Sequence, residues 1–299
     1  MIILCIQYLN SNFLALVVLT SFISSACCVS HGVTKVFIRP VAEMLQPQTV
    51  FLIEGLRPDH KVVALTIDDA PSRYTEKILD LLKQHQSTAT FFVHGDRIET
   101  AADKAIIRRM LQEGHEVANH MPESIPSASL APSIFARQFV RNHQILEKLG
   151  AHPTRFRPSH GISNMEMRNF MNTIGRNLGY KPTFYLASVY SWDINIYWPK
   201  LYAQDTAACA KPGRIVVFHD NQDVIDSKGV VINQSQRTLD ELPIFFELLE
   251  QQGFTAKSIA EVEALVNPQS ASGKMKPPGK GNGPGRRSSN DSYTSDPSI

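Results

Sequence analysis

The chain has 299 residues, with 30 Lys and Arg against 28 Asp and Glu and a formal net charge of +2. This length accommodates one large α/β domain or two small ones, each with a sizeable core. The near balance of charge argues against a nucleic-acid partner and against an anionic membrane surface. Three of the four cysteines lie within the first 28 residues, which excludes a disulfide framework and a Cys-x-x-Cys zinc site.

A mostly apolar run of 13 residues, from 13 to 25, lies near the N-terminus and leads into small residues. This pattern predicts that residues 1–28 form a signal peptide or N-terminal hydrophobic leader and that the protein is secreted or extracytoplasmic. No Lys or Arg precedes the run, so an uncleaved anchor and a mis-started reading frame remain as alternatives. Because about 20 apolar residues are needed to cross a bilayer, we expect no stable membrane span.

The remaining chain divides into three parts by composition. Residues 29–60 are an irregular N-terminal extension, with a short accessory strand expected at 50–53. Residues 61–266 alternate strand and helix patterns and form the main domain. Residues 267–299 are rich in Gly, Pro, Ser and Lys and almost free of large apolar side chains, which predicts a disordered basic tail.

The strongest strand signal is the stretch 62–71, Val-Val-Ala-Leu-Thr-Ile-Asp-Asp-Ala-Pro. Its apolar start is typical of a parallel strand that is buried on both faces. Pro71 has no backbone N–H, so we expect the strand to stop at Asp68 and Asp69. Two adjacent carboxylates at this point suit a metal ligand beside a free base, because like charges resist joint ionisation. The alternative is an Asp that caps the next helix beside a solvated neighbour.

After this strand, apolar periodicity predicts an alternation of helices and strands. Thr100 and Asp103 are expected to form a capping box. An alternation of this kind is typical of an α/β fold with a parallel sheet, and the number of units favours closure into a barrel. The helices are expected at 74–85, 100–113, 132–149, 164–178, 199–210, 236–251 and 258–266, and the strands at 89–93, 116–119, 154–157, 183–189, 214–218 and near 254.

Polar residues that could perform chemistry follow several of the expected strands. In a fold of repeated strand–helix units these positions lie on one face, so residues distant in sequence converge there. A lone histidine after a strand is more often a hydrogen-bonded structural residue, and we interpret His94, His115 and His160 in that way. The candidate residues are Asp68, Asp69, His120, Arg157, Asp193 and His219.

Five motifs, in this order, resemble those of the NodB-homology polysaccharide deacetylases of carbohydrate esterase family four, in a divergent branch. The resemblance covers about residues 61–266 and implies an irregular (β/α) barrel of about seven strands. The motifs are Thr66-Ile-Asp-Asp-Ala-Pro71, Thr88-Ala-Thr-Phe-Phe-Val93, Gly114-His-Glu-Val-Ala-Asn-His120, Arg157-Pro-Ser-His-Gly161 and Val217-Phe-His-Asp220.

The resemblance implies a catalytic role for four residues. Asp68 would be the general base that takes a proton from the attacking water, and Arg157 would orient Asp68 and hold it ionised. His219 would be the acid that protonates the leaving amine. Asp193 would support this machinery without touching the substrate. These residue types suit amide hydrolysis, which needs an activated water and an acid for a poor leaving group.

The resemblance also implies a divalent metal, usually zinc, bound by Asp69 and His120. The family ordinarily has a second imidazole four residues after the first, and here that position is Ser124. Serine is a poor zinc ligand. Glu123 stands one residue out of register and is the other candidate for the third ligand.

The expected function is therefore that of a metal-dependent hydrolase of non-peptide carbon–nitrogen bonds. It would remove acetyl groups from an N-acetylated or O-acetylated polysaccharide or oligosaccharide, as a chitin-deacetylase-like enzyme. The alternative is a catalytically impaired glycan-binding protein on the same fold. A phosphatase-type aspartate pair is disfavoured, because that chemistry uses Asp-x-Asp spacing and Asp68 and Asp69 are adjacent.

Overall fold

The computed structural model describes residue 46 and residues 48–180, 182–190, 199–220, 223–225 and 231–267. The elements of the described chain are, in order, β1 (Thr49–Val50), β2 (Val62–Ala70), α3 (Thr75–Gln84), β3 (Thr90–Val93), the 3-10 turn η2 (Gly95–Arg97), α4 (Ala101–Gln112), β4 (Glu116–Asn119), η3 (Ser127–Ser129), α5 (Pro132–Glu147), β5 (Arg155–Phe156), η4 (Ser159–Gly161), α6 (Met165–Leu178), β6 (Thr183–Tyr185), β7 (Val189–Tyr190), α7 (Pro199–Ala208), β8 (Ile215–His219), β9 (Asp223–Ile225), β10 (Val231–Asn233), α8 (Gln234–Gln251), β11 (Thr255–Lys257) and α9 (Ile259–Val266).

The main sheet is parallel and has nine strands in the order β1-β6-β5-β4-β3-β2-β8-β7, with β11 paired to the start of β2. The chain between β6 and β7 changes partner: Leu186 N donates to Val50 O, whereas Ser188 N donates to Ile215 O. A single stretch of chain thus links the β1–β6 end of the sheet to β8, and the sheet curls into an irregular (β/α) barrel. The predicted fold class is confirmed.

Side chains alternate between the inside of the barrel and its outer face, as the pleat of a strand requires. Along β2, Val63, Leu65 and Ile67 pack in the outer cluster against the helices, whereas Val62 and Ala64 belong to the inner cluster. The helix α9 adds Ile259 and Val262 to the inner cluster. Both faces of β2 are buried along its whole length, which explains its continuous apolar sequence.

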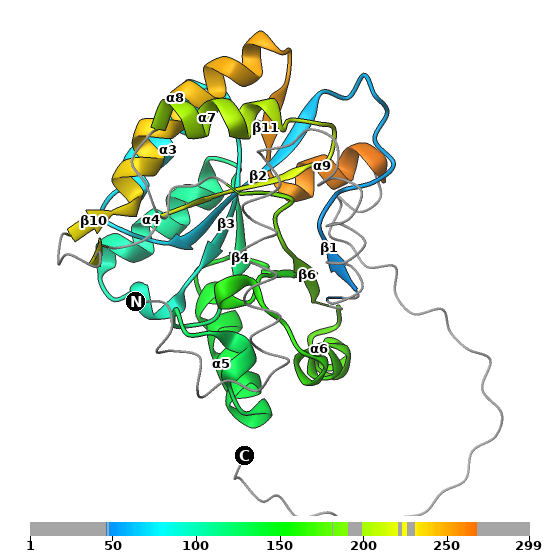
Figure 1. Ribbon diagram of the computed structural model, residues 1–299. Coiled ribbons are helices and arrows are strands. Elements are labelled where there is room, and N and C mark those ends of the chain that lie inside the picture. Colours follow the sequence, from blue (N-terminus) through cyan, green and yellow to red (C-terminus); the bar gives the residue numbers. More distant parts are fainter. Residues whose placement is uncertain are drawn as a thin grey trace, which may run out of the picture.

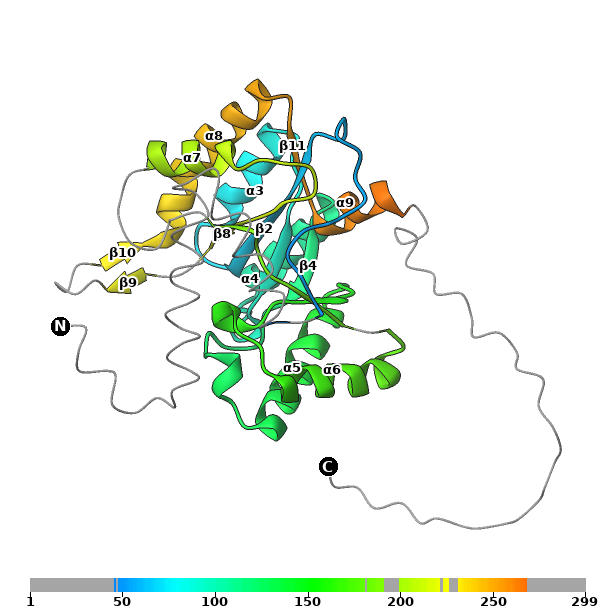
Figure 2. The same ribbon diagram turned by 45° about the vertical axis from the view of Figure 1, so that its right-hand side comes forward.

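Helices cover the outer face in two groups. α3, α7 and α8 lie together along one side of the sheet, with α4 next to α3 (Figure 1). α5 and α6 lie side by side over the other end, near β4 and β6, and Figure 2 shows the same two groups from a second direction. Phe135 and Phe139 of α5 pack with Phe156 of β5 in a separate aromatic cluster. No helix of the described chain is long and apolar enough to cross a membrane.

Most expected elements are present, and their differences from the expectation have local causes. The capping box of α4 is confirmed, with Thr100 and Asp103 bonding each other's backbone N–H groups. The strand expected at 183–189 was wrong as a single element, because the change of partner divides it into β6 and β7. β2 continues to Ala70 rather than stopping at Asp68 and Asp69. The leader (1–28), Asp193 and the tail after 267 lie outside the described residues.

Candidate active site

The end of β2 carries two adjacent carboxylates, Asp68 and Asp69. Asp68 continues the inward-facing series of the strand, after Ala64 and Thr66, and its side chain is nearly fully buried. Asp69 follows at a register shift between β2 and β3, and its backbone has a φ of +68°. An L residue adopts this left-handed conformation at a cost, and here it accompanies the register shift at the end of the strand. Both carboxylates lie near Nε2 of His120, but their shortest contacts are to different residues, Arg157 for Asp68 and His94 for Asp69.

Asp68 is held by Arg157, which follows β5. The guanidinium Nη1 of Arg157 donates to Oδ1 of Asp68 and also to Oγ1 of Thr66, at 2.9 Å. Its Nε donates to Tyr185 O at 3.1 Å, and the guanidinium lies over the ring of Phe92, 4.1 Å from the ring centroid. The cation compensates the buried carboxylate and fixes its orientation.

Asp69 lies beside two histidines from the next two strand ends, His94 after β3 and His120 after β4. Nε2 of His94 is 2.9 Å from Oδ1 of Asp69, and Nε2 of His120 is 3.4 Å from the same oxygen. One oxygen and two nitrogens, all within 4.8 Å of one another and all buried, form a group that could hold a metal ion. This donor set suits zinc, whose catalytic sites use three protein ligands of this kind and leave one position open.

The backbone determines which ring nitrogen of each histidine faces Asp69. Nδ1 of His94 donates to Met121 O at 3.1 Å, and Nδ1 of His120 donates to Arg157 O at 2.8 Å. A carbonyl oxygen only accepts, so each Nδ1 must carry a proton, and each ring presents its Nε2 to Asp69. Hydrogen bonds of this kind on the outer nitrogen are typical of metal-binding histidines.

Burial and neighbouring charges shift the pKa values of this cluster. Burial raises the pKa of Asp69, but hydrogen bonds and charge interactions with His120 and His94 outweigh it and hold the pKa well below 3.8. Burial lowers the pKa of His94, and the neighbouring His120 and Arg97 lower it further, against the attraction of Asp69. An ionised carboxylate beside a neutral imidazole is the protonation state that metal ligation requires.

His219 is the register partner of Asp68 on the adjacent strand β8. Residues paired in register on parallel strands point to the same face, so both side chains belong to the inside of the barrel. The next residue, Asp220, is fully buried and accepts hydrogen bonds from Ser72, Thr75 and Ser235. Burial raises the pKa of Asp220, whereas these hydroxyl groups and Arg97 lower it. Through its hydrogen bonds with Ser72 and Thr75, Asp220 connects the chain after β8 to the segment that follows β2.

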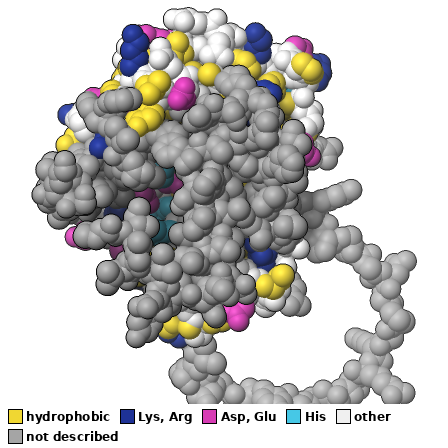
Figure 3. Space-filling model, viewed as in Figure 1, with side chains coloured by type: hydrophobic (Ala, Val, Ile, Leu, Met, Phe, Trp, Pro, Cys, Tyr) yellow, Lys and Arg dark blue, Asp and Glu magenta, His cyan; other side chains and the backbone are white. Residues whose placement is uncertain are grey.

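A polar pocket of about 440 Å³ opens beside this region and includes Pro71, Ser72 and Arg73 from the loop after β2. Glu123 and Ser124 lie on its wall and are exposed. The carboxylate of Glu123 does not belong to the group of converging ligand atoms, which is Asp69, His94 and His120 in the described chain. Figure 3 shows acidic and histidine side chains gathered at one place on this face of the molecule.

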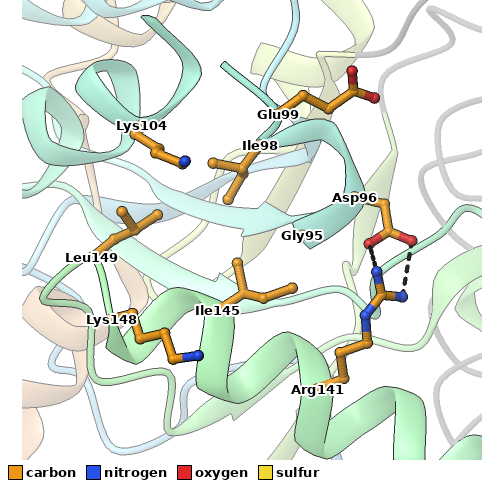
Figure 4. Close-up of a pocket in the computed structure, with 9 residues that line it drawn as sticks. All are labelled: Gly95, Asp96, Ile98, Glu99, Lys104, Arg141, Ile145, Lys148 and Leu149. Carbon is orange, nitrogen blue, oxygen red and sulfur yellow. Dashed lines mark hydrogen bonds and ion pairs between the residues drawn. The ribbon is translucent and has the colours of Figure 1, made fainter. Parts of the chain in front are cut away.

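A second pocket, of about 560 Å³, lies between α4 and α5 (Figure 4). Ile98, Ile145 and Leu149 form its apolar part, and Arg141 makes an ion pair with Asp96 at its edge. None of the residues that line it belongs to the Asp68–Arg157 pair or to the group around Asp69. The polar pocket beside Pro71 is the better candidate for a substrate cleft, because its lining includes Arg97, whose guanidinium donates to the backbone carbonyl of Asp69.

The structure brings together most of the residues that the sequence indicated, and it adds one. Asp68, Asp69, His120 and Arg157 meet at the ends of β2, β4 and β5. His94, which we interpreted as an ordinary structural histidine, lies against Asp69, and its ring is tilted against that of His120 with ring centroids 4.7 Å apart. The sequence did contain a signal for it, because His94 follows a buried strand just as His120 does. The other two histidines, His115 and His160, lie outside this group.

Comparisons with known proteins relate this chain to deacetylases. Residues 55–181 match the family model described as polysaccharide deacetylase. The peptidoglycan-N-acetylmuramic acid deacetylase PdaC of Bacillus subtilis is 29% identical over 73% of this chain, and this chain spans 42% of that protein. A peptidoglycan-N-acetylglucosamine deacetylase of Bacillus cereus is 25% identical, over 68% of this chain and 89% of that protein.

A solved structure extends the likeness to the fold. The family 4 acetyl xylan esterase from Clostridium thermocellum, solved in complex with a cobalt ion, is 25% identical with a TM-score of 0.58. The likeness covers 69% of this chain and 91% of that one. The family model, these relatives and the barrel fold together identify residues 55–181 as a polysaccharide deacetylase domain, similar to the NodB-homology deacetylases of carbohydrate esterase family four.

Proposed function

We propose that this protein is a metal-dependent hydrolase that removes acetyl groups from an N-acetylated or O-acetylated glycan. The observation that carries the proposal is the position of the Asp68–Arg157 pair. Oδ2 of Asp68 lies 3.9 Å from Nε2 of His120, so a buried and oriented carboxylate adjoins a group of residues suited to a metal. A base beside a Lewis-acid site is the arrangement that acetyl hydrolysis needs.

In this proposal Asp69 and His120 hold a divalent metal, which we take to be zinc. When bound there, the metal would polarise the acetyl carbonyl and make a nearby water more acidic. Asp68 takes a proton from the water as the water oxygen adds to the acetyl carbon. Arg157 holds Asp68 in place through its bonds to Thr66 and Tyr185.

His219 donates a proton to the leaving nitrogen as the carbon–nitrogen bond breaks, or to the leaving oxygen of an acetyl ester. Its place on β8, in register with Asp68 and on the same inner face, supports proton donation from the strand next to the base. Asp193 is proposed to support this machinery from outside the reacting atoms.

The substrate is proposed to be a polymer or oligomer that carries acetylated sugars. The polar lining of the pocket beside Pro71 suits a hydroxyl-rich ligand. The named relatives act on acetylated sugars of peptidoglycan and, in the case of the esterase, on acetyl xylan. Extracytoplasmic location is proposed from the apolar leader, because glycans of this kind lie outside the cytosol.

Release of acetate tests this function. Wild-type protein with zinc should release acetate from at least one of peptidoglycan, N-acetylated chito-oligosaccharides and acetylated xylan. Asp68→Asn should lower turnover on the order of 10²- to 10⁴-fold, as expected for loss of a general base, and should still bind zinc. Binding of these glycans without acetate release by the wild type would instead favour the glycan-binding alternative.

A further inference from the structure

We propose that His94 is the third protein ligand of the metal, in place of the imidazole that the family ordinarily carries at the position of Ser124. The inference rests on the proposed metal-dependent function and assigns a ligand from a different strand. Among the described residues, the group of converging ligand atoms contains His94 and His120, whose Nε2 atoms both face Oδ1 of Asp69.

The three ligands come from consecutive strand ends, β2, β3 and β4, which are neighbours in the sheet. Backbone bonds continue the ladder past the strands: His94 N donates to Ala70 O at 3.0 Å, and His120 N donates to Val93 O at 3.2 Å. The positions of the three Cα atoms are therefore determined by the rigid sheet. Sites built on regular elements hold their ligands more accurately than sites built on loops.

A clamp from α5 joins the two strand ends that carry the histidines. Nδ2 of Asn142 donates to Val93 O at 3.0 Å and to Oδ1 of Asn119 at 2.8 Å. The same Oδ1 accepts from Met121 N at 2.9 Å, and Met121 O accepts from Nδ1 of His94. One buried network thus determines the ring orientation of His94 relative to the end of β4.

The position of Ser124 offers no comparable support. Ser124 and Glu123 are exposed on the wall of the polar pocket, and the carbonyl of Ser124 lies 3.4 Å from Nε2 of His160. His94, by contrast, is fully buried, and its free lone pair faces a carboxylate oxygen at 2.9 Å. Two lone pairs that face each other at this distance require a cation or a proton between them.

The test compares zinc binding by full-length wild type, His94→Ala, His94→Gln and two controls. Zinc affinity is measured by competition with a chelating dye, and the number of imidazoles on bound zinc by X-ray absorption. His160→Ala removes a nearby exposed histidine, and Ser124→Ala removes the residue at the family's usual position. We expect wild-type zinc to carry two imidazoles and both His94 variants to carry one.

Loss of the ligand should weaken zinc binding on the order of 100-fold or more, because removal of outer partners alone costs 10- to 100-fold. The two controls should bind zinc as the wild type does. A single imidazole on zinc in the wild-type protein would overturn the inference without any variant, as would unchanged affinity in both His94 variants.

The outcomes also separate this inference from the proposed function. Two imidazoles on zinc without acetate release would leave His94 as a ligand and remove the deacetylase activity. Acetate release by a wild type whose zinc carries one imidazole would instead support the deacetylase activity and remove His94 as a ligand. Measured activity alone therefore does not decide the ligand.

Discussion

Arg157 and Asp68 form a buried ion pair inside the barrel although they lie 89 residues apart in the sequence. Both side chains are almost fully enclosed, at 3% and 8% exposure. Removing one partner of such a pair leaves an uncompensated charge in a medium that solvates it poorly. The pair therefore links stability to the orientation of the proposed base.

Replacement of Arg157 should destabilise the fold and abolish acetate release. Arg157→Ala is expected to lower the free energy of unfolding by about 3–5 kcal/mol, because Asp68 loses its cation. The double variant Arg157→Ala, Asp68→Asn should recover part of this loss, since the uncompensated charge of Asp68 is removed as well. Denaturant unfolding of the four proteins of the cycle measures the coupling, and additive effects of the two substitutions would contradict the ion pair.

Zinc should stabilise the folded protein through Asp69. At a free zinc concentration of 100 times Kd, binding stabilises by about 2.7 kcal/mol, which corresponds to a rise in Tm of roughly 5–10 °C for a domain of this size. Asp69→Asn should lose most of this rise. Thermal unfolding with zinc and with a chelator measures the difference. An equal rise in the variant would place zinc binding elsewhere.

Gly95 should be required for the position of His94. A Cβ at Gly95 would lie 2.2 Å from Oδ1 of Asn142 and 3.0 Å from Cδ1 of Ile145. Gly95→Ala must therefore displace the clamp from α5, and we expect a loss of about 1–3 kcal/mol together with weaker zinc binding.

Gly114→Ala is the matched control for Gly95→Ala. Gly114 has a φ of +84°, so alanine is strained there, but its Cβ would meet no atom within 4 Å. This variant should lose stability and keep the zinc affinity of the wild type. Equal zinc affinities in both glycine variants would contradict the claim that Asn142 positions His94 for zinc binding.

His115 should make stability depend on pH. Burial lowers the pKa of His115 to about 4 from an ordinary value of 6.5, and the neighbouring Glu113 opposes this shift only partly. The unfolded chain therefore binds a proton between these two values and the folded chain does not. Stability is fully present above about pH 6.5 and is lost as the pH falls toward 4, by roughly 3 kcal/mol.

In the wild type, Nδ1 of His115 accepts a hydrogen bond from Ala89 N at 3.2 Å. His115→Asn removes the titrating group and places an amide oxygen near the position of Nδ1, where it can accept the same bond. Unfolding free energies at several pH values should therefore fall less steeply toward pH 4 in the variant. His152→Asn, at an exposed histidine, should have the slope of the wild type. Parallel slopes for the wild type and His115→Asn would contradict the shifted pKa.

The helices and strands that show a clear apolar periodicity could be predicted from the sequence. The site residues could be predicted where they directly follow a strand. The first part of β2 is apolar on both faces and leads into two carboxylates. The position of Asp68 and Asp69 at the carboxyl end of a buried strand therefore follows from the pattern. The division between β6 and β7 was not predictable, because it depends on Leu186 and Ser188 bonding to different strands.

The role of His94 was missed for a related reason. Its residue type and its place after a strand were visible, but the direction of its ring depends on Met121 O. Met121 has a φ of +70°, and the sequence does not predict this value because methionine rarely adopts this conformation. The ligand that replaces an expected imidazole thus becomes apparent only when neighbouring strand ends are seen together.

The most direct test of the account is a titration of zinc-free protein with zinc, in which bound zinc and the rate of acetate release from the best glycan substrate are measured together. We predict that the rate rises in proportion to bound zinc and reaches a plateau at about one ion per chain, as three converging ligands allow. Acetate release that is unchanged in the chelated protein would contradict the account, as would full zinc occupancy with no release of acetate.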